Sequence, residues 1–367
     1  MIRTLIVACV IGVGCASSAQ AATLRVGPTR SLTVPSAAAA LAHDGDVILI
    51  DAGTYDGDTA TWRANRLTLR GVGGRAHLRA SGKSAQGKAI WVIAGNRTTV
   101  ENIEFSGATV ADANGAGIRQ EGAGLIVRRC SFHNNQNGIL TGANPLSDIL
   151  IEYSTFADNG VGDGQTHNIY IGQVRTFRMR FSTSVRAKVG HEIKSRAALN
   201  DIRYNIIDDG SAATSYSIDL PNGGESRIVG NLIVQGAHSE NTAVISYGFE
   251  GLTLPSRRLW LSHNTIVNRI VGRGTIVHAQ SGAQVVLVNT AVAGDGVLTA
   301  GPARWTLAAN RRVSVLRFKP FVGSPLVNRA VAVAAVLTPR YVPAGTRRVA
   351  RIKVGLRNDI GAFERRP

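Results

Sequence analysis

Cysteine, aromatic and acidic residues are scarce in this sequence. Its 367 residues include three Cys and 5% Phe, Trp and Tyr, and three Cys cannot build a disulfide scaffold. The 24 Asp and Glu are outnumbered by 41 Lys and Arg, which gives a net charge of +17. A hydrophobic fraction of 44% excludes a mostly disordered chain, and the preference for Val, Ile, Asn, Gly, Ser and Thr over long-helix formers argues against a helical bundle.

The first 21 residues have the pattern of a secretory signal peptide. Arg3 is followed by a short apolar run over residues 5–14, and Ala19-Gln20-Ala21 is a small-x-small cleavage site. This run is shorter than the roughly 20 apolar residues that a membrane-spanning helix needs, and no later segment is long and apolar enough either. We therefore expect cleavage after Ala21, a secreted or periplasmic protein of residues 22–367 without a membrane span, and Cys130 as its only Cys.

The excess of positive charge favours a polyanionic partner. Because a signal peptide directs the chain out of the cytoplasm, we expect an acidic polysaccharide rather than nucleic acid, and a monomeric protein. A compositional interpretation stays open: only six of the 41 basic residues are Lys, so the Arg excess can also reflect base composition.

A short motif recurs along the chain and is the most informative feature of the sequence. Its form is apolar, x, x, polar, x, apolar, and successive copies lie 23 to 33 residues apart. The last residues of the copies are Phe105, Phe132, Phe156, Ser184, Ile207, Ile233, Ile266 and Val292. Each copy alternates apolar and polar residues, which is typical of a β-strand, and turns rich in Gly, Asn and Asp separate the copies.

A second short strand is predicted after each copy of the motif. Its predicted inward residues are Ile118, Ile139, Ile169, Ile193, Ile218, Ile245 and Val277. This spacing predicts a coil with two or three strands per turn, in which each turn pairs with the next at the strand spacing of about 4.8 Å. Asn205, Asn231 and Asn264 occupy the same place in their copies, so we predict a structural ladder of side-chain amides.

The repeats and both ends of the chain resemble the right-handed parallel β-helix proteins of the pectate lyase-like superfamily. The resemblance implies an all-β solenoid in a single domain, with an N-terminal cap over about 22–65, coils over about 66–300 and a closing segment over about 301–367. The stretch LTVPSAAAALAHDGDVILIDAGTY resembles the family's entry cap, with a short helix around residues 35–43, and SPLVNRA to NDIGAFE resembles its closing segment. Inward side chains of such a coil form the core, so function is expected on an outer face.

Unusual polar residues gather in the middle turns of the predicted coil, next to the inward isoleucines. On a solvent-facing wall we expect Arg119, Leu140, Asn168, Tyr170, Glu192, Lys194, Ser217, Asp219, Ser246 and His278. Adjacent bends are expected to add His167, His191, Arg196, Asn222, Glu225, His238 and Glu240. Because early turns carry Gly or apolar residues at the corresponding places, this local concentration indicates a site.

The segment HEIKSRAALNDIRYN resembles the alginate lyase and chondroitinase B group of β-helix polysaccharide lyases. Glu192, Lys194, Ser195 and Asn205 match residues of that group, whereas Asp219 stands where the group has its catalytic Arg. The resemblance implies β-elimination of a glycosidic bond beside a uronic acid. That reaction removes a weakly acidic C5 proton, so it needs a base near C5 and a group that neutralises the sugar carboxylate.

The predicted roles follow from these needs. Lys194, beside the cationic Arg196, is the predicted base, and Tyr170 or His191 is the predicted donor to the leaving oxygen. The carboxylate would be neutralised by Asn168, by His167, or by a calcium ion held by Glu192, Asp219 and Glu225. The predicted substrate-binding residues are Arg119, His167, Asn168, Asn222 and His238.

Structural interpretations of the same residues stay open. Lys194 can simply pair with Glu192 or Asp219 across turns, and His191 can be a bend residue bonded to the backbone. His263 lies within the recurrent motif and His133 directly follows a copy of it, which favours a packing role for both.

Two other functions compete with a lyase. A glycoside hydrolase needs two carboxylates that flank the bond, and Glu192 and Asp219 on neighbouring turns are candidates. A non-catalytic β-helix that binds a cell-surface glycan needs neither a base nor an acid. Zinc-ligand spacing, a P-loop, a dinucleotide fingerprint and a nucleophile elbow are absent from the sequence.

Overall fold

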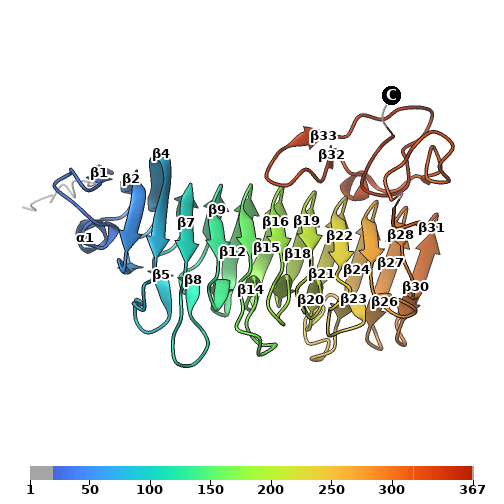
Figure 1. The fold of residues 1–367 in the computed structure, drawn as a ribbon, viewed down its shortest axis with the longest axis horizontal. Helices are drawn as coiled ribbons and strands as arrows, with labels where there is room; N and C mark the ends of the chain where they lie inside the picture. The colour runs from blue at the N-terminus through green and yellow to red at the C-terminus, as the bar shows by residue number, and fades with distance from the viewer. Residues whose placement is uncertain (1–19, 317, 366–367) are drawn as a thin grey trace, which may run out of the picture.

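The computed structural model describes residues 20–316 and 318–365. Most of the predicted signal peptide lies outside these residues, so that peptide stays a prediction. The described chain forms one elongated coil of short parallel strands (Figure 1). Each full turn of the coil contributes one strand to each of three ladders, which we call A, B and C.

Ladders A and B meet along one edge of the coil and share two long strands, β2 (Val47–Asp56) and β4 (Thr68–Arg79). The other strands of ladder A are β1 (Thr23–Val26), β6 (Thr98–Glu101), β9 (Leu125–Arg128), β12 (Asn144–Glu152), β15 (Val174–Arg180), β18 (Leu199–Arg203), β21 (Glu225–Val229), β24 (Arg258–Ser262), β27 (Gln284–Val288) and β30 (Arg304–Ala308). The other strands of ladder B are β7 (Ile103–Ser106), β10 (Ser131–His133), β13 (Thr155–Ala157), β16 (Thr183–Val185), β19 (Ile206–Asp208), β22 (Leu232–Gln235), β25 (Thr265–Asn268), β28 (Ala291–Ala293) and β31 (Arg311–Val313).

Ladder C is a separate parallel sheet on the remaining face. Its strands are β3 (Ala60–Trp62), β5 (Ala89–Ile93), β8 (Ala116–Gln120), β11 (Asn137–Thr141), β14 (Ile169–Ile171), β17 (Ile193–Ser195), β20 (Ile218–Leu220), β23 (Ala243–Tyr247), β26 (Thr275–Ala279) and β29 (Val297–Ala300). Apart from the three ladders, the structure contains α1 (Pro35–Leu41), a 3₁₀ turn (Ala335–Leu337) and the antiparallel pair β32 (Tyr341–Val342) and β33 (Val349–Ala350).

The recurrent motif forms a bend between ladders A and B rather than one strand. Its third residue has a left-handed backbone in every copy, with φ between 49° and 66°. These residues are Asn102, Arg129, Tyr153, Phe181, Tyr204, Gly230, His263 and Asn289. One strand therefore ends before this residue and another begins soon after it, which turns the chain from ladder A into ladder B. The last residues of successive copies pair with one another from Phe105 through Val292, so the predicted register is confirmed.

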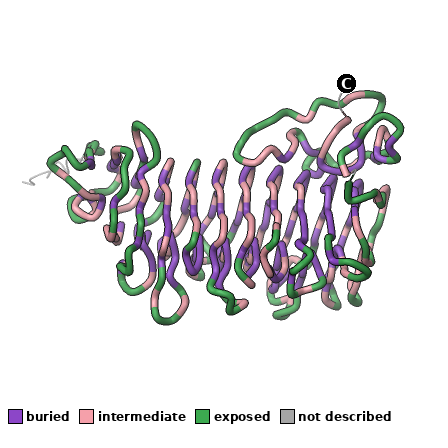
Figure 2. The backbone as a smooth tube through the Cα atoms, viewed as in Figure 1, coloured by how far each residue is buried: buried purple, intermediate pink, exposed green. Residues whose placement is uncertain are grey.

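The core runs along the inside of the coil (Figure 2). The seven predicted inward residues of ladder C are all fully buried. Phe105, Phe132 and Phe156 stack with ring centroids 5.0 and 4.7 Å apart, so identical side chains fill the same place in successive turns. The predicted asparagine ladder is also confirmed, because the amides of Asn205, Asn231 and Asn264 bond in sequence at 3.1 Å.

Both ends of the coil carry additional chain. The predicted cap helix is present as α1, which buries Ala38 against the first strands. The C-terminal residues fold back along the side of the coil (Figure 1), where Tyr204 Oη accepts a hydrogen bond from the Arg340 backbone at 3.2 Å. Within this segment, Arg351 and Glu364 form a buried ion pair of 2.7 Å that joins two parts of the C-terminal chain. In the part of the chain that the structure describes, no helix is long and apolar enough to cross a membrane.

Candidate functional site

The outer face of ladder C carries the predicted row of polar side chains. The backbone register places Arg119, Leu140, Tyr170, Lys194 and Asp219 on successive strands, from β8 to β20. Since the isoleucines preceding these residues point into the core, the row itself faces outward. An open groove of about 710 Å³ lies over this face, and its lining includes Arg119, Tyr170, Lys194, Arg196 and Glu250.

Glu250 joins the two cations at the centre of the groove. Its Oε1 accepts a hydrogen bond from Lys194 Nζ at 2.8 Å, and its Oε2 lies 2.5 Å from Arg196 Nη2. Partial burial raises the pKa of Glu250, but the hydrogen bonds and charges of Lys194 and Arg196 outweigh burial and hold the pKa below its ordinary value. A carboxylate of the protein thus lies where an anionic group of a ligand would meet two cations.

Arg196 also fixes two of its neighbours. Its Nε donates to Tyr170 Oη at 2.9 Å, and its Nη1 donates to Asn222 Oδ1 at 2.6 Å. Because the Tyr170 oxygen accepts this bond, its own hydroxyl hydrogen is free to donate into the groove. The structure therefore brings Tyr170, Lys194, Arg196 and Asn222 together, as the sequence predicted.

Asp219 lies beneath Lys194 and is nearly inaccessible to solvent. Its Oδ2 is 3.3 Å from Lys194 Nζ and 3.6 Å from His191 Nε2. Burial raises the pKa of Asp219, and the charge of Lys194 opposes that rise. The open structural interpretation of Lys194 is thus half right: the ammonium does pair with Asp219, but it pairs with Glu250 in the groove as well, and it does not pair with Glu192.

His167 and His191 are buried at the bend that precedes ladder C. Their rings stack 4.7 Å apart, and each Nδ1 accepts a backbone N–H at 3.1 Å, from His191 and Tyr216 respectively. Burial lowers the pKa of His167 to about 3 and that of His191 well below its ordinary value, so both rings are neutral at pH 7. With 2% and 6% of their surfaces exposed, they do not reach a ligand in the groove, which corrects the substrate-binding prediction for His167 and favours the bend interpretation of His191.

Asn168 and Glu192 face the interior, contrary to the predicted solvent-facing wall. Oε2 of Glu192 accepts hydrogen bonds from Asn168 Nδ2 and Ser184 Oγ, both at 2.6 Å, and its Oε1 accepts from the Ala187 backbone at 2.9 Å. Desolvation, with the nearby Asp209 charge, raises the pKa of Glu192 to about 8, so the group is neutral at pH 7. The chain turns just before each strand of ladder C, so strand alternation does not extend to these positions and their side chains point into the corner.

The three carboxylates predicted to hold calcium do not converge. Glu192 is in the interior, Asp219 lies on ladder C, and Glu225 lies on ladder A, where it pairs with Arg227. Within residues 20–316 and 318–365, their oxygens form no group with ligand spacing. Calcium needs about six to eight oxygens around one point, so these residues do not fit it. His238 is exposed and is not part of the groove lining.

Glu250 and its neighbour Phe249 were missed by the sequence reasoning. They belong to the loop between β23 and β24, which folds over ladder C. Phe249 is 41% exposed, and its ring centroid lies 4.3 Å from that of His278 on β26. The available signal was weak: an aromatic and an acidic residue adjacent in a loop flanked by glycines, GFEG.

The described coil defines the class of the protein by its fold, which is a right-handed parallel β-helix. A family model described as "Right handed beta helix region" matches residues 68–239. Among solved structures, pectate lyase Pel9A is similar with a TM-score of 0.64 and 16% identity, over 94% of this chain and 96% of that chain. A pectin methylesterase from Aspergillus niger is similar with a TM-score of 0.38 and 14% identity, over 81% of this chain and 88% of that chain. No curated protein matches the sequence.

Proposed function

We propose that the groove over ladder C binds an acidic, uronate-containing polysaccharide and cleaves it by β-elimination. The observation that carries this proposal is the Glu250 carboxylate held between Lys194 and Arg196. A uronate carboxylate has the same charge and the same planar pair of oxygens, so it can take the place of Glu250. The net charge of +17 would help to attract such a polymer, and the fold shared with pectate lyase Pel9A supports the same class of substrate.

The residues around the displaced Glu250 supply the groups that an elimination needs. Arg196 would bind the uronate carboxylate and stabilise the charge that develops there as the C5–H bond breaks. The Lys194 amine would take the C5 proton, and the bonding electrons would form the C4–C5 double bond as the C4–O bond breaks. Tyr170, which already accepts from Arg196, would donate its hydroxyl proton to the leaving oxygen.

Displacement of Glu250 also prepares Lys194 for this role. In the structure the ammonium lies against two carboxylates, 2.8 Å from Glu250 and 3.3 Å from Asp219. When the substrate carboxylate binds to Arg196 instead, Lys194 Nζ loses its contact with Glu250 and can approach the C5 proton. Arg119, on β8 and in the lining of the same groove, would bind the carboxylate of a further sugar unit.

The structure argues against a glycoside hydrolase that uses Glu192 and Asp219 as its two carboxylates. Such a hydrolase requires both groups to flank the glycosidic bond, and Glu192 is buried among Asn168, Ser184 and Ala187. Export of the enzyme by the predicted signal peptide remains part of the proposal.

Lys194→Ala and Lys194→Arg test the proposal together. Arg keeps the positive charge but does not give up its proton in proteins, so it cannot act as a base. On a panel of polyuronates, the wild type should release unsaturated products that absorb in the ultraviolet. In both variants the rate of product formation should be lower by at least about 10³-fold. The Arg variant should still bind the polymer.

The other outcomes are distinct. Elimination retained in either variant would reject Lys194 as the base. New reducing ends without ultraviolet absorbance would indicate a hydrolase. Salt-dependent binding without any cleavage would indicate a glycan-binding protein.

A further inference from the structure

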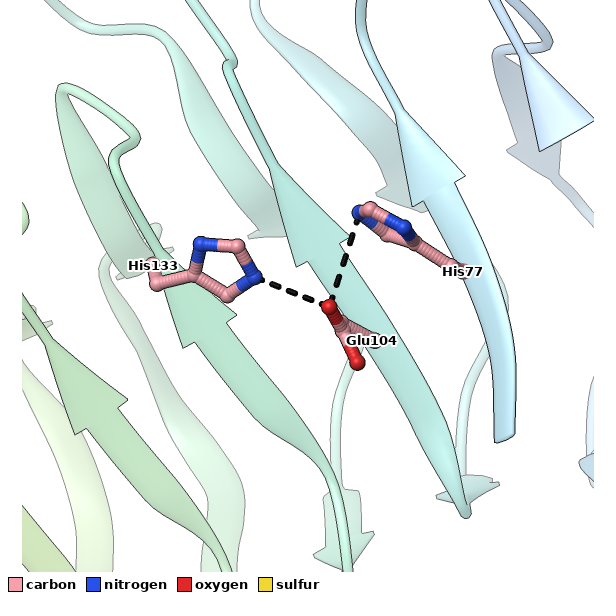
Figure 3. Close-up of side chains that lie close together, drawn as sticks. All are labelled: His77, Glu104 and His133. Carbon is pink, nitrogen blue, oxygen red and sulfur yellow. Dashed lines mark hydrogen bonds and ion pairs between the residues drawn. The ribbon is translucent and has the colours of Figure 1, made fainter. Parts of the chain in front are cut away.

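Three polar side chains meet on the outer face of ladder B, on a different sheet from the groove. His77 lies on β4, Glu104 on β7 and His133 on β10, so they come from three successive turns (Figure 3). The backbone register pairs His77 with Glu104, and it pairs Ser106, two residues further along β7, with His133. Strand alternation therefore puts all three side chains on one face.

The inward side chains between them hold these strands firmly. Leu78, Phe105 and Phe132 are fully buried, and the two phenylalanine rings stack 5.0 Å apart. The packing of the core thus fixes the backbone from which the three outward side chains project.

Both histidines point at the same carboxylate oxygen. His133 Nε2 is 2.9 Å from Glu104 Oε1, and His77 Nε2 is 3.6 Å from the same atom. One donor atom from each residue lies within 4.8 Å of the other two, and in the part of the chain that the structure describes this is the one such group of three His, Cys, Asp or Glu residues. The side chains are 25–30% exposed, so an ion can enter from solvent.

The donor set matches a divalent transition metal. Two imidazoles and one carboxylate are ligands that zinc accepts, at bond lengths of about 2.0–2.2 Å. Tetrahedral geometry at these lengths separates ligand atoms by about 3.3 Å, a value between the two distances measured from Glu104. We propose that His77, Glu104 and His133 bind a zinc-class divalent metal ion, with water in the fourth position.

The surroundings of the cluster suit this assignment. Asn134 Nδ2 lies 3.2 Å from His133 Nδ1; with a metal ion on Nε2 the ring would carry its proton on Nδ1, and the Asn134 amide would turn so that its oxygen accepts that proton. Ser106 Oγ lies 2.7 Å from His77 Nε2, and a metal bond would replace this hydrogen bond. Arg79, two residues from His77, is paired with Asp56 at 2.8 Å, so its charge is compensated outside the cluster.

The site would clamp the early turns of the coil. One ion would bond to side chains of all three neighbouring strands, β4, β7 and β10, in addition to the backbone hydrogen bonds and core contacts that already join them. This inference is independent of the proposed elimination, because none of its residues lines the groove over ladder C.

Zinc titration of the untagged full chain tests the site. After treatment with a chelator and its removal, isothermal titration calorimetry with zinc chloride should show one ion per chain, and melting temperature should rise with zinc. His77→Ala, His133→Ala and Glu104→Gln should each weaken binding at least about tenfold. His43→Ala, which removes an exposed histidine elsewhere, should bind zinc like the wild type.

Cobalt gives a second readout. Co²⁺ bound by two imidazoles and a carboxylate should give visible absorption bands that disappear in His77→Ala. The proposal is overturned if the wild type binds no zinc saturably, or if the three variants bind as tightly as the wild type. Glu104→Gln retains the size and shape of the side chain, so its zinc affinity tests the proposed site even where an alanine variant fails to fold.

Discussion

The buried carboxyl group of Glu192 is predicted to be protonated and to stabilise the fold, and one substitution tests this. The carboxyl is fully buried, and its pKa is raised from 4.5 to about 8 by desolvation and by the charge of Asp209. The change to test is Glu192→Gln, which keeps the shape of the side chain but cannot ionise. It replaces one acceptor oxygen with an NH₂ group, and it therefore disturbs the bonds from Asn168 and Ser184.

The size of the effect follows from the two pKa values. Between pH 4.5 and about 8 the native state holds a proton on Glu192 that the unfolded chain has released, so the free energy of unfolding falls as the pH rises. At about 1.4 kcal/mol per pH unit, the loss over this window is at most about 5 kcal/mol. The stabilising contribution is complete below pH 4.5 and is lost progressively up to about 8.

In Glu192→Gln, the free energy of unfolding should not show this fall with rising pH. At pH 4.5 the variant should be less stable than the wild type by about 1–3 kcal/mol, because buried donors lose an acceptor. As the pH rises, the difference should shrink and then vanish or change sign. Urea denaturation of both proteins at several pH values measures the difference directly.

Two results would refute this reasoning. A stability difference that does not change with pH would mean that Glu192 has the same pKa in the folded and unfolded chain. A wild type that gains on the variant as the pH rises would mean that the buried group is ionised and paired with a cation, as a metal ligand would be.

Two further predictions concern the groove and the asparagine ladder. Glu250→Gln should tighten polyuronate binding about three- to tenfold at low salt, measured by calorimetry, because the charge that occupies Lys194 and Arg196 is removed; weaker binding would contradict the displacement model. Asn231→Ala should lower the free energy of unfolding by about 3 kcal/mol in urea denaturation, because it removes the oxygen that accepts from the Asn205 amide and backbone N–H and the amide that donates to the Ile202 carbonyl. The exposed Asn114→Ala is its control, with an expected change of about 0.5 kcal/mol or less, and equal losses in both variants would show that the ladder is not stabilising.

The fold was predictable because the repeat is a local property of the chain. A stacked apolar residue must recur once per turn, so the spacing of the motif predicted which residues pair, from Phe105 with Phe132 to Ile266 with Val292. The same logic predicted the ladder of Asn205, which needs the same side chain at the same corner. It did not show that the motif is a bend, because a left-handed backbone at Tyr204 or His263 leaves no composition signal.

The site was predictable only where it follows strand stacking. Tyr170 and Lys194 are neighbours because β14 and β17 pair, and the sequence contains that information. Asn168 and Glu192 were misplaced because they precede their strands, where the chain turns and alternation no longer applies.

By itself, the sequence determined the coil, its register and the outer face that carries Lys194, because apolar spacing fixes which side chains must be buried. Only the tertiary structure decided that Glu250 reaches Lys194 across 56 residues and that His77 and His133 meet at Glu104. Contacts of this kind depend on how a loop folds over a sheet or on which outward residues of separate turns coincide. Because no local periodicity requires such contacts, no pattern in the sequence predicts them.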